Sequence, residues 1–502
     1  MKPLHMGIGL LMLALTACGD DGDKASSAPL DTLKYVAVGA PATAGYDPHG
    51  GIGNQSDLTR FALVYDVLTK PGNDGSTEFR LATAFEPDEK LTTWTVKLRD
   101  DAKFTDGRPV RAADVLFSLR RIHEKAAENF GRLQMFDFAK SSIVDDHTLK
   151  LLTSQPYAEV PRALESISFV VPEETTAFDK PVVGSGPYRM TGGNAENAVL
   201  ERNDGWWGQK PPTRRIEIRA VVDPQARAQA VISGQADVAS AVSPAAARQI
   251  AQNNKLKVVH RPAVTMYPFV MRLDREPFDD PRVREAVKLA TDRQELLDKV
   301  FLGFGQVGND LLTPADPSSP RDVPQRTRDL DRAKKLLKEA GHAGGLKLTL
   351  STTTSYPGMD TAATLFAQQL GEAGIDVEVK MQAPDTYWTN VFAKNDFYTG
   401  FFGGIPFTDV ARVSLLGDSP TNETAWRHPA WDKAFGDALA TKDEAARRKI
   451  LGDLQREVRD EGGYVVWGTG DGLDLAAKGV TGLPEGPGFH SAFIEQVRVM
   501  AP

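Results

Sequence analysis

The sequence predicts an α/β protein with mixed sheets in at least two lobes, and three observations support this fold class. The chain has 502 residues, which is too long for one ordinary hydrophobic core. Segments that alternate apolar and polar residues, as half-buried strands do, are interspersed with segments of helical periodicity. The 44 glycines and 32 prolines lie scattered between these segments, which is typical of turns in a folded chain.

The first half of the chain alternates predicted strands with predicted helices. The strands are expected over 33–38, 92–98, 142–152 (a hairpin-like pair), 198–202, 216–222 and 236–238, and residues 183–190 are expected to form a glycine-proline turn that leads into a strand. The helices are expected over 57–68, 112–124 and 224–233, and Gly234 fits the left-handed cap of the last one. The strand–helix–strand order from 216 to 238 indicates an α/β lobe.

The second half repeats this alternation and adds clear helix starts. Asp280-Pro281 opens one helix, and Asp292 with Glu295 resembles a capping box for the next. Further helices are expected over 331–340, 362–371, 429–439 and 444–458, and strands over 346–350, 375–381, 397–404 and 464–467. The strand–helix–strand unit from 346 to 381 should be parallel and right-handed.

Residues 1–17 have the features of an export signal. Lys2 precedes the apolar run Met6–Leu15, which is shorter than the about 20 residues of a membrane span. Leu15-Thr16-Ala17-Cys18 resembles the lipobox of bacterial lipoproteins, which implies cleavage before Cys18 and lipidation of its sulfur. Cys18 is the single cysteine, so no internal disulfide is expected. Residues 18–29 are small, polar and acidic, and are predicted to form a flexible tether.

The net charge and the hydropathy of the chain limit the classes of partner that it is expected to have. The formal net charge is −8, whereas a nucleic-acid-binding protein needs a basic face. No second apolar stretch approaches the length of a membrane span. The chain is therefore expected to be an exported monomer that touches the membrane through its lipid anchor.

Five collinear segments carry a family resemblance. The longest is Lys97–Leu119, where a strand leads through the turn Lys103–Gly107 into a helix that begins at Ala112. The other four are Val144–Leu149, Gly184–Tyr188, Pro277–Arg293 and His428–Asp432. Together they resemble the extracellular solute-binding proteins of family 5, the peptide and nickel class of ABC importers, from about residue 33 to the end.

The resemblance implies a two-lobed periplasmic-binding-protein fold, a clamshell of the large class with an extra subdomain and a two-strand hinge. It places lobe I in 30–70, 182–264 and 474–502, the extra subdomain in 71–181, and lobe II in 265–473. The implied function is to capture a peptide or peptide-like solute and deliver it to the ABC permease subunits, without catalysis or a cofactor. Most signature residues are expected to be structural, with Asp114 and Asp280 at helix starts.

Ligand contacts are implied by the places where family pockets lie. These are the loop after the first strand, the hinge, and the segment around the strand at 397–408. The corresponding residues are Tyr46, Asp47, Met266, Tyr267, Tyr387, Trp388, Phe402, Gly403, Gly404, Phe407, Asp409 and Trp467. Aromatic side chains suit such a pocket because they give large contact area with few rotatable bonds. For each of them, packing in the core is the competing interpretation.

One departure from the family pattern keeps the ligand class open. Peptide-binding relatives often carry, on the strand equivalent to 402–409, an aspartate that pairs with the ligand's α-amine. Here Phe407 or Thr408 stands in its place and Asp409 is the only carboxylate left nearby. A peptide is the first expectation; an opine, a sugar conjugate, a nickel chelate, and an exported hydrolase on the same scaffold are the alternatives. Nickel is disfavoured because the eight histidines are dispersed.

No sequence motif indicates catalysis. Gly303–Gly308 matches G-x-G-x-x-G, but a dinucleotide site needs a strand before the motif and a helix after it, and here a helix precedes. Gly184-Ser185-Gly186 lacks the full nucleophile-elbow pattern. No catalytic residue, metal ligand or cofactor is therefore predicted.

Overall fold

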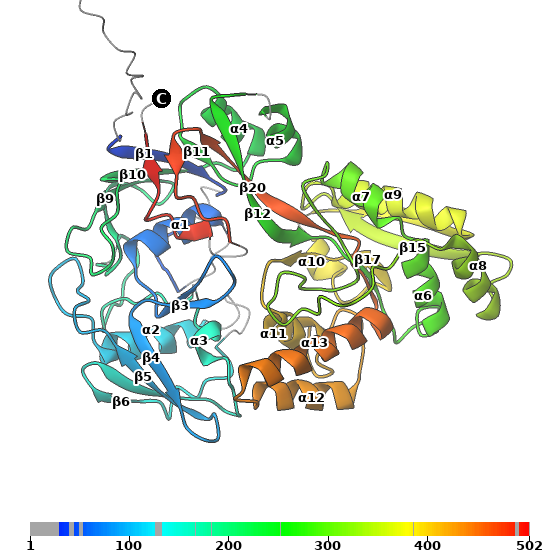
Figure 1. The fold of residues 1–502 in the computed structure, drawn as a ribbon, viewed down its shortest axis with the longest axis horizontal. Coiled ribbons are helices and arrows are strands. Elements are labelled where there is room, and N and C mark those ends of the chain that lie inside the picture. The colour runs from blue at the N-terminus through cyan, green and yellow to red at the C-terminus, as the bar shows by residue number, and fades with distance from the viewer. Residues whose placement is uncertain are drawn as a thin grey trace, which may run out of the picture.

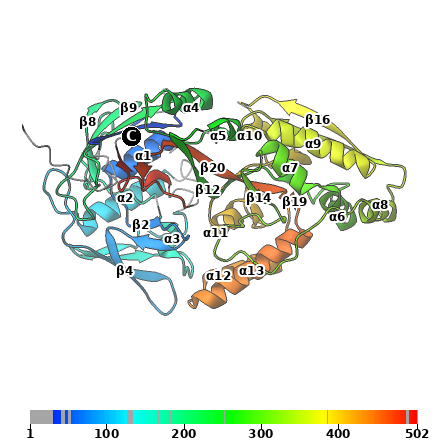
Figure 2. The ribbon, with the colours of Figure 1, turned by 45° about the horizontal axis from the view of Figure 1, so that its top comes forward.

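The computed structural model describes residues 30–39, 45–49, 54–125, 133–165, 167–181, 183–250, 253–384, 386–486 and 491–500. They form two lobes that lie side by side, and the long strands β12 (Leu256–Met266) and β20 (Gly468–Ala477) run between them (Figures 1 and 2). The predicted signal, 1–17, and the tether with Cys18 lie outside the described residues. No helix in the described part of the chain is long and apolar enough to cross a membrane.

The first lobe is built on a nine-stranded mixed sheet. Its order is β18-β12-β20-β11-β1-β10-β9-β8, and β14 pairs with β20. The remaining strands are β1 (Thr32–Ala37), β8 (Tyr188–Gly193), β9 (Asn197–Arg202), β10 (Arg215–Ala220), β11 (Val238–Ala239), β14 (Gly305–Val307) and β18 (Phe402–Gly403). Strand β1 is parallel to both β10 and β11, and α4 (Pro224–Ile232) connects those two, as the strand–helix–strand order predicts.

A four-stranded antiparallel sheet with one main helix lies below this sheet in the view of Figure 1. Its strands are β4 (Ala82–Pro87), β5 (Thr93–Leu98), β7 (Thr148–Leu152) and β6 (Ser142–Asp145), and its helix is α2 (Ala112–Glu124). The Asp114 carboxylate accepts hydrogen bonds from the amides of Arg111 (2.8 Å) and Glu173 (2.7 Å). The predicted structural role of Asp114 at the helix start is therefore confirmed.

The second lobe is built on a five-stranded sheet with the order β16-β15-β17-β13-β19. These strands are β16 (Ile375–Gln382), β15 (Leu346–Thr353), β17 (Phe397–Thr399), β13 (Phe269–Met271) and β19 (Tyr464–Val465). Its larger helices are α6 (Pro281–Ala290), α7 (Arg293–Val300), α8 (Leu330–Glu339), α9 (Met359–Glu372), α12 (Pro429–Leu439) and α13 (Glu444–Glu461). Strands β15 and β16 are parallel, as predicted, and the carboxylates of Asp280 and Asp292 cap α6 and α7.

Shorter elements complete the described chain. They are α1 (Gln55–Val64), β2 (Thr69–Pro71), β3 (Thr77–Phe79), α3 (Val160–Ala163), α5 (Pro244–Ile250), α10 (Tyr387–Asn390), α11 (Phe407–Val410), a π-helical turn (Ala411–Leu415), β21 (Val480–Thr481) and β22 (Arg498–Val499). Helix α1 ends at Val64, earlier than predicted, where its carbonyl lies 2.0 Å from a Cβ built on Gly184. Only glycine allows this close approach, which explains part of the Gly-Ser-Gly-Pro segment.

The prediction of one strand over 397–404 is wrong. The segment forms β17 in the five-stranded sheet and β18 in the nine-stranded sheet, with Gly400 and Phe401 between them. Two neighbouring segments make the same change of sheet, from β12 to β13 and from β19 to β20. The lobes are thus joined where three chain segments pass from one sheet to the other.

Candidate ligand-binding cleft

A cleft lies between the two lobes and takes its walls from both. It encloses about 710 Å³ of space, part of which is open to solvent. The first lobe contributes Pro71, Gly75, Arg162 and Glu165, and the hinge contributes Ala263 and Met266. The second lobe contributes the loop Leu312–Pro317, and Gly403 of the hinge strand β18 completes the wall with the residues Gly404–Pro406 that follow it. Residues far apart in the sequence therefore meet at one site, as expected for a ligand that is enclosed by two lobes.

The two lobes touch each other directly beside this cleft. Arg162 Nη2 lies 2.9 Å from Asp316 Oδ2, and Arg447 Nε lies 3.2 Å from Glu159 Oε1. The Ala158 amide donates to the Leu439 carbonyl at 2.7 Å. These contacts bring α3 and its preceding loop against the second lobe, so the described conformation is one in which the lobes are in contact.

Electrostatics keep the pair across the cleft ionised. Burial opposes ionisation of Asp316, but the Arg162 guanidinium and hydrogen bonds from Ser318 and the Phe407 amide hold the pKa of its carboxyl below the usual value. Burial also works against the charge on Arg162, and the nearby carboxylate of Asp316 nevertheless raises the pKa of its guanidinium. Both groups therefore carry their charge at neutral pH.

Three of the predicted contact residues lie in the wall of the cleft. Met266, Gly403 and Gly404 line it. Phe407 reaches the site only through its backbone, because its amide donates to Asp316 Oδ2 at 3.0 Å while its side chain is buried against Trp431. That these residues contact a ligand stays a prediction.

Two predicted contact residues are packed inside the fold. Trp467 is fully buried at the change from β19 to β20, where its Nε1 donates to the Tyr267 carbonyl at 2.7 Å and its ring stacks on Phe301. Tyr387 is also fully buried, and its hydroxyl donates to the Thr399 carbonyl at 2.7 Å. Core packing therefore describes both side chains in this conformation.

An aromatic cluster beside the hinge contains two further predicted residues. Phe401 stacks on Tyr356 with 3.9 Å between ring centroids, and Trp388 and Tyr267 lie at its edges, 6.5 and 6.3 Å away. Trp388 is partly exposed, whereas Tyr267 is buried and its hydroxyl donates to the Pro357 carbonyl. Phe402, the next residue along, is buried in β18.

The remaining predicted residues have partners of their own. The Asp47 carboxylate is held by both Nη atoms of Arg121 at 2.6 Å, which, against the effect of burial, lower the pKa of Asp47 to about 2. Tyr46 lies under the guanidinium of Arg60, and Asp409 lies 3.6 Å from Arg412. None of the three lines the cleft.

The charged residues of the cleft were missed by sequence reasoning. Arg162 lies in a helix of only four residues and Glu165 follows that helix, while Asp316 stands between two prolines in a loop, so none lies in a periodic pattern. The expectation that Asp409 is the only carboxylate near the 402–408 segment is wrong, because Asp316 accepts a hydrogen bond from the Phe407 amide. The feature of the sequence that could have pointed to Asp316 is its position in the Pro-Ala-Asp-Pro segment.

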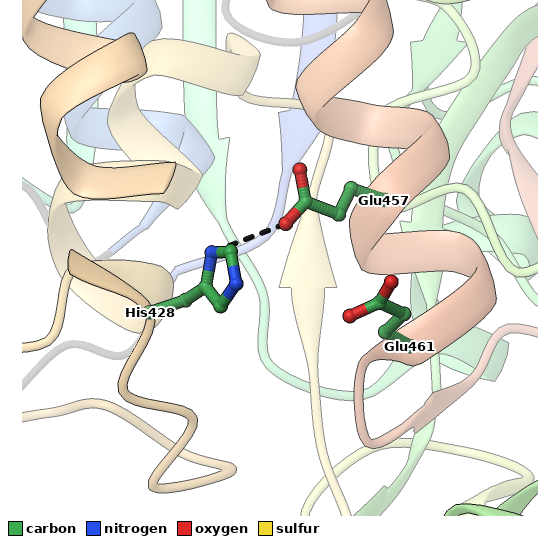
Figure 3. Close-up of side chains that lie close together, drawn as sticks. All are labelled: His428, Glu457 and Glu461. Atoms are coloured by element: carbon green, nitrogen blue, oxygen red, sulfur yellow. Dashed lines mark ion pairs between the residues drawn. The ribbon is translucent and has the colours of Figure 1, made fainter. Parts of the chain in front are cut away.

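Among the described residues, one group could hold a metal ion. His428, which caps α12, lies with Glu457 and Glu461 of α13, and one potential ligand atom from each lies within 4.8 Å of the others (Figure 3). His428 Nδ1 is 3.1 Å from Glu457 Oε1, while the Trp431 amide also points to Nδ1. Glu461 is exposed, and none of the three residues lines the cleft.

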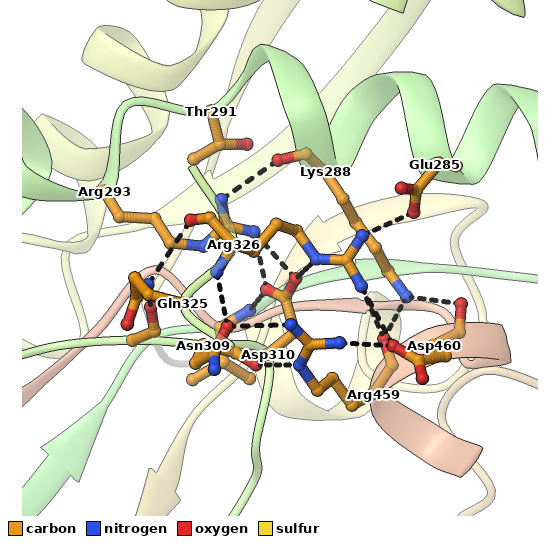
Figure 4. Close-up of polar contacts among 12 residues, drawn as sticks. Glu285, Lys288, Thr291, Arg293, Asn309, Asp310, Gln325, Arg326, Arg459 and Asp460 are labelled. Atoms are coloured by element: carbon orange, nitrogen blue, oxygen red, sulfur yellow. Dashed lines mark hydrogen bonds and ion pairs between the residues drawn. The ribbon is translucent and has the colours of Figure 1, made fainter. Parts of the chain in front are cut away.

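A buried polar network lies in the second lobe, in the same loop as Asp316. The Asp310 carboxylate binds Arg293 Nη2 at 2.7 Å and Arg326 Nε at 2.8 Å, and it accepts a hydrogen bond from the Val466 amide (Figure 4). Lys288 Nζ donates to the carbonyls of Arg459 (2.8 Å) and Asp460 (3.4 Å) at the end of α13. All of these partners belong to the second lobe, so the network holds that lobe together.

Comparison with known proteins gives the family. The family described as bacterial extracellular solute-binding proteins, family 5, matches residues 77–420. The chain belongs to this family. The family is one of solute-binding proteins, and the two-lobed fold with a cleft between the lobes is in accord with that role.

Individual relatives agree on the fold and differ in what they bind. The glutathione-binding protein GsiB of Pectobacterium atrosepticum is 26% identical over 431 residues, which cover 80% of this chain and 82% of that protein. HbpA2 from Haemophilus parasuis superposes with a TM-score of 0.83 at 19% identity over 94% of this chain and all of its own. AgaA from A. tumefaciens R10, solved with agropinic acid, has a TM-score of 0.76 at 23% identity over 94% of this chain and 99% of its own.

Proposed function

We propose that this family 5 protein is the substrate-binding lipoprotein of an ABC importer, which captures a peptide-like solute between its lobes and delivers it to the membrane permease. The observation that carries the proposal is the cleft that both lobes line, with glycines 403 and 404 leaving backbone open on one wall. The glutathione-binding relatives, at 26% identity, support a small peptide-like ligand. The lobe boundaries expected from the family resemblance are part of this proposal.

A thermal-shift screen of the full chain in detergent tests the ligand class. The library contains di- to pentapeptides, N-blocked peptides, glutathione, agropinic acid, oligosaccharides and nickel chelates. A ligand at one hundred times its Kd stabilises the folded state by about 2.7 kcal/mol, so peptide-like members should raise the Tm. Chromatography of the hit after incubation should recover it unchanged. Turnover of the hit, or no hit in the whole library, contradicts the proposal.

Membrane attachment through Cys18 is tested separately. The wild-type chain should fractionate with membranes and incorporate labelled palmitate, because acylation at a lipobox cysteine gives stable anchoring. Cys18→Ser should be unlabelled while binding the same ligand. A wild-type chain that takes up no label, or a Cys18→Ser variant that is still labelled, would exclude this anchor.

A further inference from the structure

The charged lining of the cleft is dominated by one ion pair that joins the two lobes. Three lining residues carry charged side chains: Arg162 and Glu165 from the first lobe, and Asp316 from the second. The 2.9 Å contact between Arg162 and Asp316 spans the space in which a solute would be enclosed. A solute that enters between the lobes therefore meets this pair directly.

Each partner is held in place by its own lobe. Asp316 accepts hydrogen bonds from the Ser318 amide (2.8 Å), the Ser318 hydroxyl (2.7 Å) and the Phe407 amide (3.0 Å). Arg162 lies on α3, and its buried Nε has no hydrogen-bond partner among the described residues. One N–H group of the guanidinium therefore makes no hydrogen bond there. The two charges stay on opposite walls when the lobes separate.

Breaking such a pair has a cost that a ligand must offset. A buried charge that loses its partner without a replacement is strongly unfavourable. A ligand with only an anionic group would leave Asp316 unpaired, and one with only a cationic group would leave Arg162 unpaired. A ligand that carries both groups can replace each partner with a charge-assisted hydrogen bond.

We propose that the Arg162–Asp316 pair stands where the ligand binds, and that the cleft selects small zwitterionic solutes by replacement of both partners. The cationic group of the solute binds Asp316, with Glu165 on the same wall as Arg162, and its anionic group binds Arg162. This inference rests on the proposed function, and it names the charge class of the solute. It also assigns specificity to three residues outside the segments in which sequence analysis placed the ligand contacts.

A charge-matched ligand series tests the inference. Each peptide of the screen that has no ionisable side chain is supplied in four forms: free, N-acetylated, C-amidated, and blocked at both ends. Free forms should bind at least about tenfold more tightly than either singly blocked form, because each blocked form leaves one buried charge unpaired. A blocked form that binds equally well, or a hit among solutes without both charges, overturns the inference and leaves the proposed function standing. No hit in any form contradicts both.

Variants of Arg162 and Asp316 show whether the pair recognises the ligand or only holds the two lobes together. In calorimetry, Arg162→Gln should lose about tenfold in affinity for the free form and should no longer distinguish it from the C-amidated form. Asp316→Asn should likewise lose the distinction between free and N-acetylated forms. This crossed pattern is expected only if each residue meets one end of the ligand.

The second interlobe ion pair supplies the matched control. Arg447 pairs with Glu159 across the lobes but does not line the cleft. Arg447→Gln should change affinity for the free form less than about threefold and should preserve its preference over both blocked forms. If Arg447→Gln weakens binding as much as Arg162→Gln, and neither variant alters the preference, the pair only holds the lobes together and the inference is wrong.

Discussion

Asp310 and Asp316 lie in one loop between β14 and α8, yet their partners come from different places. Asp310 is fully buried and binds Arg293 and Arg326, both from the second lobe. Asp316 is nearly as buried, but its arginine, Arg162, comes from the first lobe. When the lobes separate, the first carboxylate keeps its partners and the second regains water. A buried ion pair within one lobe therefore supports the fold, whereas a pair between lobes responds to their opening.

The largest effect is expected at Asp310. Asp310→Asn leaves two buried guanidinium groups, Arg293 and Arg326, without their common counter-ion. Removal of one partner from such a group costs about 3–5 kcal/mol, so the midpoint of urea unfolding should fall sharply. The control is Asp322→Asn, because Asp322 is an exposed carboxylate paired with Arg456 at the surface. Equal midpoints for the two variants would show that the Asp310 network contributes nothing to stability.

The same network contains a buried amine, that of Lys288, and its titration should make the free energy of unfolding depend on pH. Lys288 is fully buried with carbonyl partners, and burial lowers the pKa of its amine from 10.5 to about 7. Between these two values the unfolded chain holds a proton that the folded chain lacks. The free energy of unfolding should therefore rise with pH across this window, by up to about 1.4 kcal/mol per pH unit.

Lys288→Met tests that sign. Its stability between pH 7.5 and 9 should rise less steeply than that of the wild type, because no amine remains to titrate (urea titrations at about four pH values suffice). The control is Lys335→Met, since Lys335 is exposed and should keep the wild-type slope. A Lys288→Met variant with the wild-type slope would mean that the Lys288 amine is charged in the folded protein at neutral pH.

The sequence predicts correctly those elements whose bounds depend on local patterns. The bounds of α2 and α12 agree with prediction because apolar spacing and helix starts are encoded within one turn. The strand expected over 397–404 divides at Gly400, since its pairing depends on a distant segment, where the Gly400 amide donates to the Pro268 carbonyl and the Val270 side chain packs against Gly400. The cleft could not be predicted from local patterns, because Arg162 and Asp316 come together only in the folded chain. Trp467 shows the opposite error: it was predicted to line the pocket, but its side chain is buried in the core. An aromatic residue looks the same in the sequence whether it lines a pocket or packs in a core.

The smallest effect on stability, and the largest on shape, is expected at Asp316. Asp316→Asn removes the charge that holds Arg162 across the cleft. The lobes can then separate and return Arg162 to water, so the free energy of unfolding should fall only by about 1–3 kcal/mol, the cost of the amide hydrogen bond that asparagine cannot accept at one of its two side-chain positions. Ligand-free small-angle scattering should instead show a larger radius of gyration, since the equilibrium between open and closed forms shifts towards the open one.

The contrast between the two aspartates depends on this pair of outcomes. Asp316→Asn should open the molecule without unfolding it, and Asp310→Asn should destabilise it without opening the lobes first. Asp322→Asn again serves as the control, with an unchanged radius of gyration. If Asp316→Asn lowers stability as much as Asp310→Asn and leaves the scattering unchanged, Asp316 is a structural residue of the second lobe. The lobes would then be held together by other contacts, of which Arg447–Glu159 is the first to examine.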